Sequence, residues 1–209
     1  MALRVGVLLS GGGTTLQNIL DHIDRGELPA EVVCVISSRA DAYGLVRAQR
    51  HGIPAHVVSR KAYGADAAGF NDRIWALLRE ARVELVVLAG FMSLLDVPED
   101  YRRRILNTHP ALIPAFCGKG MYGHHVHEAV LAYGAKVSGA TIHFADSAYD
   151  EGPIVLQEAV PVLEGDTPDS LAERVMAKER ELYPRAIRLF AEGRLRVEGR
   201  RVRILPAPR

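Results

Sequence analysis

The chain has 209 residues, of which 48% are hydrophobic and 24% are charged, and its formal net charge is +1. A chain of this length buries about 70% of the surface that it exposes when unfolded, so it can form one large domain. The near-neutral charge gives no long-range attraction to nucleic acid or to an anionic membrane. No apolar run is long enough to span a bilayer. We therefore expect a globular protein that binds small molecules, and neither nucleic acid nor membrane.

The cysteine content and the N-terminal sequence indicate a location. Cys34 lies in an apolar run and Cys117 in a glycine-rich stretch, so the two form no disulfide framework, which suggests a reducing compartment. The apolar run at Val5–Leu9 is much shorter than the core of a secretory signal peptide. We expect a cytoplasmic protein.

The first half of the chain alternates apolar runs with helical patterns. A Val/Leu run at 3–9 is followed by Ser10–Gly13 and predicts a strand that is buried on both faces. Apolar residues at helical spacing from 16 to 23 predict a helix, with Thr14 or Thr15 as its cap. The alternation recurs, with expected strands at 32–36, 56–58 and 85–89 and helices at 45–51, 70–81 and about 98–103. This order predicts an α/β fold, a Rossmann-like and mostly parallel sheet with helices on both faces.

The second half follows a different pattern. After a strand at 104–108, we expect a helix at 124–133 and two strands at 137–144 and 153–160, at least one of them antiparallel. The acidic loop 145–152 separates these two strands. A long helix opens at 166–168, with a kink at Pro184 and an apolar inner side, and a basic hairpin at 195–204 closes the chain. The expected inner residues of the helix are Leu171, Val175, Leu182, Ile187 and Phe190. We predict a single domain over 1–209, with a phosphate-binding half at 1–105 and a catalytic and cofactor-binding half at 106–209.

The glycine turn, Ser10–Thr15, joins the first strand to the first helix. Consecutive backbone N–H groups and a helix N-terminus form a common phosphate site in proteins. No lysine follows the last glycine, so this is not a Walker A loop. A dinucleotide site would need an acid after the second strand, but the chain reads Ser37-Ser38-Arg39, and Arg39 could at most suit a 2′-phosphate. We prefer a phosphomonoester as the ligand, and a tight turn without any ligand is the alternative.

An amide and an imidazole stand two positions apart at the end of the strand expected at 104–108. Side chains alternate along a strand, so Asn107 and His109 point to the same face. Pro110 keeps His109 in the extended region of the backbone map. Open α/β sheets bind ligands at such strand ends. The alternative is that Asn107 is a turn residue and His109 a structural histidine in the core.

Asp150, in the acidic loop, is the third candidate. A carboxylate near His109 would raise the imidazole pKa toward or above neutrality and make the ring a usable acid. The N–H donor of Asn107 could meet an oxygen that gains negative charge. Together, the three side chains predict addition to a carbonyl group. The alternative for Asp150 is an ordinary solvated loop acid.

A metal site has to be considered because five of the eight histidines lie between His109 and His143. The adjacent His124, His125 and His127 lack the spacing of a known zinc motif, and the two cysteines are far apart. We expect no metal. His143, in an apolar strand, is a candidate for a supporting position beside the site.

Four ordered motifs together resemble the folate-dependent formyltransferases. They are Val7–Thr14, Val86–Met92, Asn107–Pro114 and the segment from His143 to Pro153, and the resemblance runs from Arg4 to about Leu195. Several motifs in a consistent order are more specific than any one of them. Members that formylate initiator methionyl-tRNA carry a C-terminal domain that 209 residues cannot hold. The length therefore favours a small nucleotide as the formyl acceptor.

The resemblance implies transfer of a formyl group from 10-formyltetrahydrofolate to the primary amine of glycinamide ribonucleotide, in purine biosynthesis, by a monomer or a homodimer. It implies that Asn107 binds the formyl oxygen, that His109 exchanges protons with the amine and the leaving folate nitrogen, and that Asp150 raises the pKa of His109. The implied binding residues are Gly13, Thr14 and Thr15 at the phosphate, Glu179 near the ribose, and Met92, Ser93, Leu94, Leu95 and Asn107 at the folate.

Several positions depart from the family pattern. Thr15 stands where the family commonly has asparagine, and Ser93 where it often has arginine. The stretch 64–68 lacks an arginine that the family often carries, and Lys119 is a candidate for the missing charge. Three alternatives stay open: an NADP-linked reductase, a non-enzymatic sensor of nucleotide or folate, and a hydrolase of formyltetrahydrofolate.

Overall fold

The computed structural model describes residues 2–207 and divides into two compact units, the first ending at Leu106 and the second beginning at Asn107. This boundary lies inside strand β5 (Ile105–His109), next to the predicted division between residues 105 and 106. The single domain over the whole chain stays a prediction.

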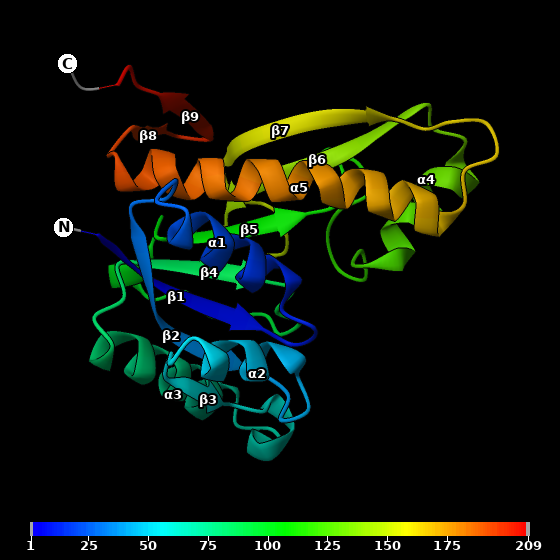
Figure 1. Ribbon diagram of the computed structural model, residues 1–209. Coiled ribbons are helices and arrows are strands. Elements are labelled where there is room, and N and C mark those ends of the chain that lie inside the picture. The colour runs from blue at the N-terminus through cyan, green and yellow to red at the C-terminus, as the bar shows by residue number, and fades with distance from the viewer. Residues whose placement is uncertain (1, 208–209) are drawn as a thin grey trace. The chain divides into compact units, whose positions relative to one another are not determined.

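Parallel strands form the centre of the first unit (Figure 1). They are β1 (Leu3–Leu9), β2 (Ala30–Ser37), β3 (Ala55–Val57) and β4 (Leu85–Ala89), in the order β3-β2-β1-β4. β1 pairs in parallel with β2 on one side and with β4 on the other, and β2 pairs in parallel with β3. Most side chains of β1 are fully buried, as a strand covered on both faces requires. The predicted parallel sheet is confirmed.

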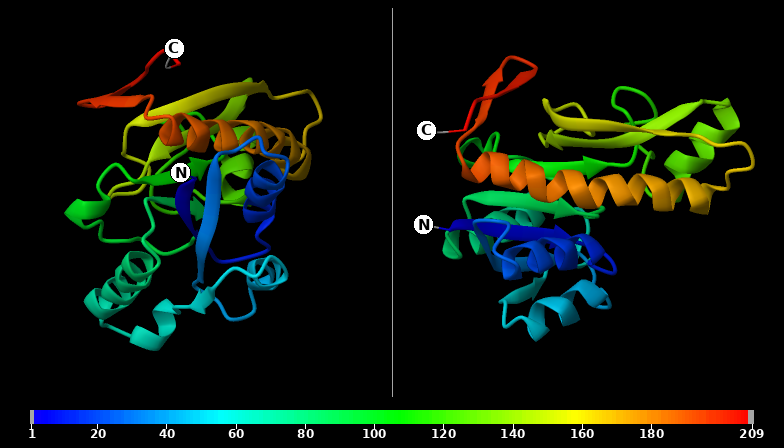
Figure 2. Two further views of the ribbon diagram at one scale, coloured as in Figure 1. Left: turned by 60° about the vertical axis from the view of Figure 1, so that its left-hand side comes forward. Right: turned by 45° about the horizontal axis from the view of Figure 1, so that its top comes forward.

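The helices of the first unit cover both faces of these strands. Figure 2 (left) shows α1 (Thr14–Asp24) and α2 (Tyr43–Arg50) on one side and α3 (Ala67–Glu80) on the other. Two glycines allow the close packing. A Cβ at Gly6 would lie 2.7 Å from Leu78 of α3, and a Cβ at Gly44 would lie 2.5 Å from Leu9 of β1.

Two sequence predictions in the first unit are wrong. The helix expected at about 98–103 is only a short 3-10 turn, η2 (Glu99–Tyr101), because Arg102 is extended and Arg103 has a φ of 60°. The ring of Tyr101 stacks on that of Trp75, with centroids 5.0 Å apart, which holds this turn against α3. Neither Thr14 nor Thr15 caps α1, since the N-cap is Gly13, in the left-handed conformation. A second 3-10 turn, η1 (Arg60–Tyr63), precedes α3.

The second unit mixes parallel and antiparallel strands. It holds β5, β6 (Val137–Phe144), β7 (Ile154–Pro161), β8 (Leu195–Glu198) and β9 (Arg201–Ile204), in the order β5-β6-β7-β9-β8. β6 and β7 are antiparallel, as are β8 and β9, whereas β7 and β9 are parallel. The predicted antiparallel strands in the C-terminal half, including the closing hairpin, are confirmed.

Two helices accompany these strands: α4 (His124–Tyr133), which has the predicted bounds, and α5 (Pro168–Ala191). Figures 1 and 2 show α5 lying along β6 and β7. Thr167 and Ser170 form a capping box at its start, and the helix continues through Pro184 as one element. Of the residues expected inside, Phe190 is half-buried, whereas Leu171, Val175, Leu182 and Ile187 are buried.

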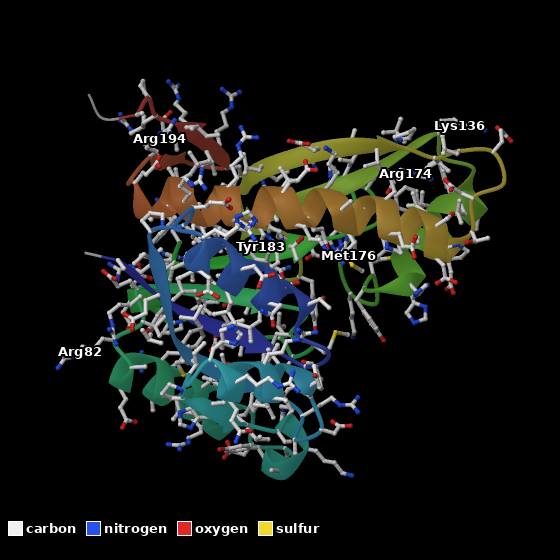
Figure 3. All side chains as sticks on the ribbon, in the orientation of Figure 1. Arg82, Lys136, Arg174, Met176, Tyr183 and Arg194 are labelled. Atoms are coloured by element: carbon white, nitrogen blue, oxygen red, sulfur yellow. The ribbon has the colours of Figure 1, made fainter. Side chains whose placement is uncertain are left out.

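Helix α5 is amphipathic along its length. Figure 3 marks three of its side chains, of which Tyr183 is fully buried, Met176 is exposed and Arg174 is paired with Asp166.

Between residues 2 and 207, no helix combines the length and the apolar character that crossing a membrane requires.

Candidate active site

Strand β5 directs its polar side chains alternately to two sides, as predicted. Asn107 and His109 turn toward β6 and the loops beside it, where they contact His143 and Phe116. Thr108, between them, points the other way, and its Oγ1 donates a hydrogen bond of 2.8 Å to Oε1 of Glu179 on α5. Period-2 alternation therefore separates a pair with reactive chemistry from a side chain that reaches the helix.

His109 is buried, with 3% of its surface exposed, and both ring nitrogens face oxygen atoms. Nε2 lies 2.8 Å from the carbonyl oxygen of Phe116, and Nδ1 lies 3.5 Å from Oδ2 of Asp150. A carbonyl oxygen only accepts hydrogen bonds, so we assign the proton of the neutral ring to Nε2. Nδ1, which faces the carboxylate, is then the nitrogen that gains and loses a proton.

The carboxylate of Asp150 lies between two imidazoles. Oδ2 accepts a hydrogen bond of 2.9 Å from the N–H of Gly118, and Oδ1 lies 3.5 Å from Nε2 of His143. The structure thus brings Asp150 to His109, and the solvated loop acid is the wrong alternative. Asp150 and Phe116, which both face His109, have φ values of 56° and 50°. Residues other than glycine are rarely left-handed, and such strain clusters at functional sites.

His143 orients the amide of Asn107. Its Nδ1 lies 3.0 Å from the carbonyl oxygen of Phe144, so this nitrogen carries the ring proton. Nε2 of the neutral ring can therefore accept a hydrogen bond from Nδ2 of Asn107, 3.1 Å away. One N–H of the amide is fixed in this way, and the NH₂ group has a second N–H to offer to a ligand. His143 thus lies beside Asn107, in the position that the sequence suggested for it.

The pKa of His109 departs from the sequence prediction. Burial lowers the pKa of the imidazole, and this effect outweighs the raising by Asp150 and by the Phe116 carbonyl. The neighbouring His143 lowers it further. The prediction that Asp150 raises the pKa of His109 above its ordinary value is therefore wrong in its net direction. Burial destabilises the charged ring by more than the nearby carboxylate stabilises it. His109 is neutral at pH 7 and suited to act first as a base.

The pKa of Asp150 moves in the direction that keeps the carboxylate charged. Burial raises it, but the neighbouring His143, the hydrogen bond from the Gly118 N–H and the neighbouring His109 together lower it more, so that the net pKa is lowered. A backbone donor and two imidazoles that can take up a proton stabilise the ionised form of this carboxylate. The site therefore combines a neutral imidazole with a carboxylate.

Glu179 belongs to the same unit as this cluster. Its carboxylate accepts the hydrogen bond from Thr108, and burial raises its pKa even though that bond and Arg180 lower it. The side chain expected near the substrate ribose is therefore placed beside the strand that carries Asn107 and His109.

The other histidines of the second unit have separate partners. Nε2 of His124 lies 3.2 Å from Asp169, and Nδ1 of His125 lies 3.3 Å from Glu128. His127 is buried, and burial together with the charge of His124 lowers its pKa. Over residues 2–207, no group of three or more His, Cys, Asp or Glu side chains is arranged to hold a metal ion.

The glycine turn, in the first unit, leaves the start of α1 without a side-chain cap. Gly13 has a φ of 69°, no side chain caps the helix, and its first turn holds no acid. Ser10, at the start of the turn, is buried, and its Oγ accepts hydrogen bonds from Ser38 Oγ at 2.6 Å and from the N–H of Met92 at 3.0 Å. The first N–H groups of a helix have no intrahelical acceptor, so this end favours an anion.

The segment expected to line a folate pocket follows β4. Met92 and Leu94 are 51% and 43% exposed, whereas Leu95 is buried, and Ser93 lies between the exposed pair. The bond from Met92 to Ser10 ties this segment to the glycine turn. Arg39, the residue on which a 2′-phosphate site would depend, forms a two-pronged pair with Asp41.

Comparison with known proteins assigns the family. Residues 3–187 match the formyl transferase family. The chain belongs to this family.

Relatives of this formyl transferase differ in length. A phosphoribosylglycinamide formyltransferase of Haemophilus influenzae is 39% identical over 197 residues, which make up 93% of this chain and 90% of that protein. The glycinamide ribonucleotide transformylase 1 of Symbiobacterium toebii superposes with a TM-score of 0.91 at 50% identity, over 98% of this chain and 95% of that chain. The trifunctional purine biosynthetic protein adenosine-3 of Gallus gallus is 40% identical over 93% of this chain, which spans only 19% of that protein.

Sequence reasoning missed three contacts in the site of this formyl transferase. They are the carbonyl of Phe116 on His109, the N–H of Gly118 on Asp150, and Thr108 on Glu179. The first two are backbone groups, which leave no mark on residue type. Thr108 could have been identified, because alternation along β5 directs it away from its two neighbours.

Proposed function

We propose that this formyl transferase is a phosphoribosylglycinamide formyltransferase, which moves a formyl group from 10-formyltetrahydrofolate to the primary amine of glycinamide ribonucleotide. The observation that carries the proposal is the cluster of Asn107, His109 and Asp150 in a chain that covers 90% of a phosphoribosylglycinamide formyltransferase at 39% identity. An uncharged N–H donor, a neutral imidazole and a carboxylate are the groups that addition of an amine to a formyl carbon requires.

The reaction forms one bond and breaks another. The amine nitrogen attacks the formyl carbon, and the formyl oxygen becomes an oxyanion. Nδ1 of His109 takes the proton that the amine nitrogen loses, and Asp150, 3.5 Å away, stabilises the imidazolium. The same proton then goes to the folate nitrogen as the bond between that nitrogen and the formyl carbon breaks. The direction of the His109 pKa, below its ordinary value, supports a base in the first step.

Asn107 is the proposed donor to the oxyanion. Its amide is held by His143, so the second N–H is oriented before the substrate binds. A donor that needs no reorganisation is worth more to the transition state than a mobile one, and removing such a donor typically lowers the rate by about 10²- to 10³-fold.

The substrate contacts follow from the same proposal. Gly13, Thr14 and Thr15 would bind the ribonucleotide phosphate through the N-terminal end of α1, and Glu179 would accept hydrogen bonds from the ribose. Met92, Ser93, Leu94 and Leu95 would bind the folate, and Asn107 would bind its formyl oxygen. Both ligands are small molecules, and we propose a cytoplasmic enzyme that is a monomer or a homodimer.

One assay tests the function. A 10-formyl folate analogue is incubated with the protein, and its deformylation is followed by absorbance with and without glycinamide ribonucleotide. We expect deformylation only when the amine is present, because the amine is the nucleophile and His109 takes the proton that it loses. Deformylation at the same rate without the amine would identify a hydrolase instead, and NADPH binding without formyl transfer would support a reductase.

The variant His109→Ala tests the assigned base. We expect turnover to fall by about 10²- to 10⁴-fold, since a positioned proton-transfer group contributes that much, while the binding of glycinamide ribonucleotide persists. The control is His22→Ala, which removes another partly buried histidine that faces a carboxylate, that of Glu27 at 2.6 Å. Full turnover in His109→Ala would contradict the role of this side chain.

A further inference from the structure

Arg47, on α2, reaches across to the glycine turn. Its Nε donates a hydrogen bond of 2.9 Å to the carbonyl oxygen of Gly12, and one of its terminal nitrogens donates a bond of 2.9 Å to Oε1 of Gln17 on α1. The guanidinium carbon lies 5.1 Å from the centroid of the Tyr43 ring, a cation–π distance. The planar group is thus held on three sides, in a geometry that the ammonium of lysine cannot reproduce.

Helix α2 fixes two consecutive peptide groups of the turn. The carbonyl of Gly11 accepts a hydrogen bond of 3.1 Å from the N–H of Gly44, and the carbonyl of Gly12 accepts the bond from Arg47. In a planar trans peptide the C=O and N–H groups point in opposite directions. The N–H groups of Gly12 and Gly13, which share these two peptides, therefore both point away from α2.

The next peptide continues the same arrangement. The carbonyl of Gly13 accepts the first helical bond of α1, 2.9 Å from the N–H of Gln17. The N–H of Thr14 therefore points back toward the start of the helix. Successive N–H groups that converge in this way form a concave site for an anion.

The packing between the turn and α2 leaves no space for a side chain at Gly13. A Cβ at Gly13 would lie 2.6 Å from the Cα of Gly44 and 3.4 Å from Cδ of Arg47. The backbone of the turn thus contacts the backbone of α2, and the side chain of Arg47 packs beside this contact.

We propose that Arg47 is a positioning residue for the substrate phosphate. It holds the Gly12 carbonyl so that the Gly13 N–H faces the phosphate, and it adds a positive charge beside the turn. This inference rests on the proposed function. It assigns to α2 a role in the phosphate site, namely to orient the turn and to add a positive charge.

The variant Arg47→Met tests the inference by steady-state kinetics. It keeps the length of the side chain and removes both the charge and the two hydrogen bonds. We expect KM for glycinamide ribonucleotide to rise about tenfold, the equivalent of one well-placed hydrogen bond, while kcat and KM for the formyl folate stay unchanged. Phosphate contacts act on bound substrate and transition state alike, so their loss appears in KM.

Three comparisons make this test specific. Arg47→Lys keeps the charge but not the two directed bonds, so its KM should rise as well, and full rescue by lysine would overturn the positioning role. With the dephosphorylated substrate, wild type and Arg47→Met should behave alike, and an equal penalty on both substrates would also overturn it. The matched control is Arg50→Met, because the Arg50 guanidinium lies over the same Tyr43 ring, at 5.8 Å, one turn further along α2. Its KM should match that of wild type.

A second measurement separates the inference from the proposed function. Inorganic phosphate is titrated into ¹⁵N-labelled wild type and Arg47→Met, and the amide signals of Gly12 and Gly13 are followed. We expect both signals to shift with phosphate in wild type and to require more phosphate in the variant. Equal titration curves would refute the role of Arg47 even if wild type turned over glycinamide ribonucleotide. If wild type showed no formyl transfer, the proposed function would fail while this titration still tested Arg47.

Discussion

At the scale of single residues, the site depends on the balance between burial and charge at His109. The ring is almost fully buried, which favours its neutral form, and it faces Asp150 and the Phe116 carbonyl, which favour its charged form. Burial prevails, so the pKa of His109 is lowered. A neutral ring that lies beside a carboxylate can accept a proton during the reaction and hold it briefly. This is what a base that later acts as an acid has to do.

The variant Asp150→Asn should lower the pKa of His109 further. The carboxylate is the largest of the effects that raise this pKa, and the amide keeps its shape without its charge. We expect the titration midpoint of the His109 ring signals in NMR to move to lower pH, and turnover to fall at every pH. Glu151→Gln, which neutralises the adjacent exposed acid, is the control and should leave both unchanged. A midpoint that moved upward in Asp150→Asn would show that the charge of Asp150 does not act on His109.

At the scale of elements, the glycine turn that precedes α1 packs against α2 through contacts that only glycine permits. Gly13 has a left-handed backbone and lies against the backbone of Gly44, so that a side chain has neither the conformation nor the space that it needs. Gly12, its neighbour, is free of this restriction, since a Cβ there would meet nothing within 4 Å. The two glycines therefore have different roles in the same turn.

Substitution by alanine should separate these roles. We expect Gly13→Ala to lower the free energy of unfolding by at least about 1 kcal/mol, since alanine is strained at positive φ and the turn must also move away from α2, and to raise KM for glycinamide ribonucleotide. Urea denaturation and steady-state kinetics measure the two effects. Gly12→Ala is the matched control and should change stability little. Equal losses in both variants would mean that the contact with Gly44 does not determine the turn.

At the scale of the whole molecule, buried neutral histidines make stability depend on pH. His127 is 4% exposed, and burial, with His124 and His109, lowers its pKa below the ordinary value. The unfolded chain binds a proton at about pH 6.5, where the folded chain does not yet do so. The free energy of unfolding is therefore highest above this pH and falls as the pH drops from there toward the folded pKa.

His127→Phe should remove part of this loss. The phenyl ring is similar in size and does not titrate, so the variant gains stability relative to wild type as the pH falls, by at most about 1.4 kcal/mol per pH unit. Urea unfolding near pH 8 and near pH 5.5 gives the two free energies. The exposed His125, changed to alanine, is the control. A variant that lost stability with acid as steeply as wild type would exclude His127 as a source of the effect.

The sequence by itself determined where most strands lie and which side chains of a strand share a face. The residue pattern predicted β1, β4 and β6 with their exact bounds, and in β1 and β4 the signal was a mostly apolar run, which is typical of a buried strand. Alternation along β5 placed Asn107 and His109 on one face, because that is a local property of an extended backbone. Ordered motifs then indicated the formyl transferase family.

Only the tertiary structure decided how these pieces act on one another. The cap of α1 is Gly13 rather than a threonine because α2 packs against the turn, and no local pattern records that contact. The carbonyl of Phe116 reaches His109 through backbone atoms, which every residue has. The net direction of the His109 pKa is set by the difference between desolvation and nearby charge. Desolvation and nearby charge both depend on the distances between residues that are separated in the chain. Those distances are fixed only when the chain folds.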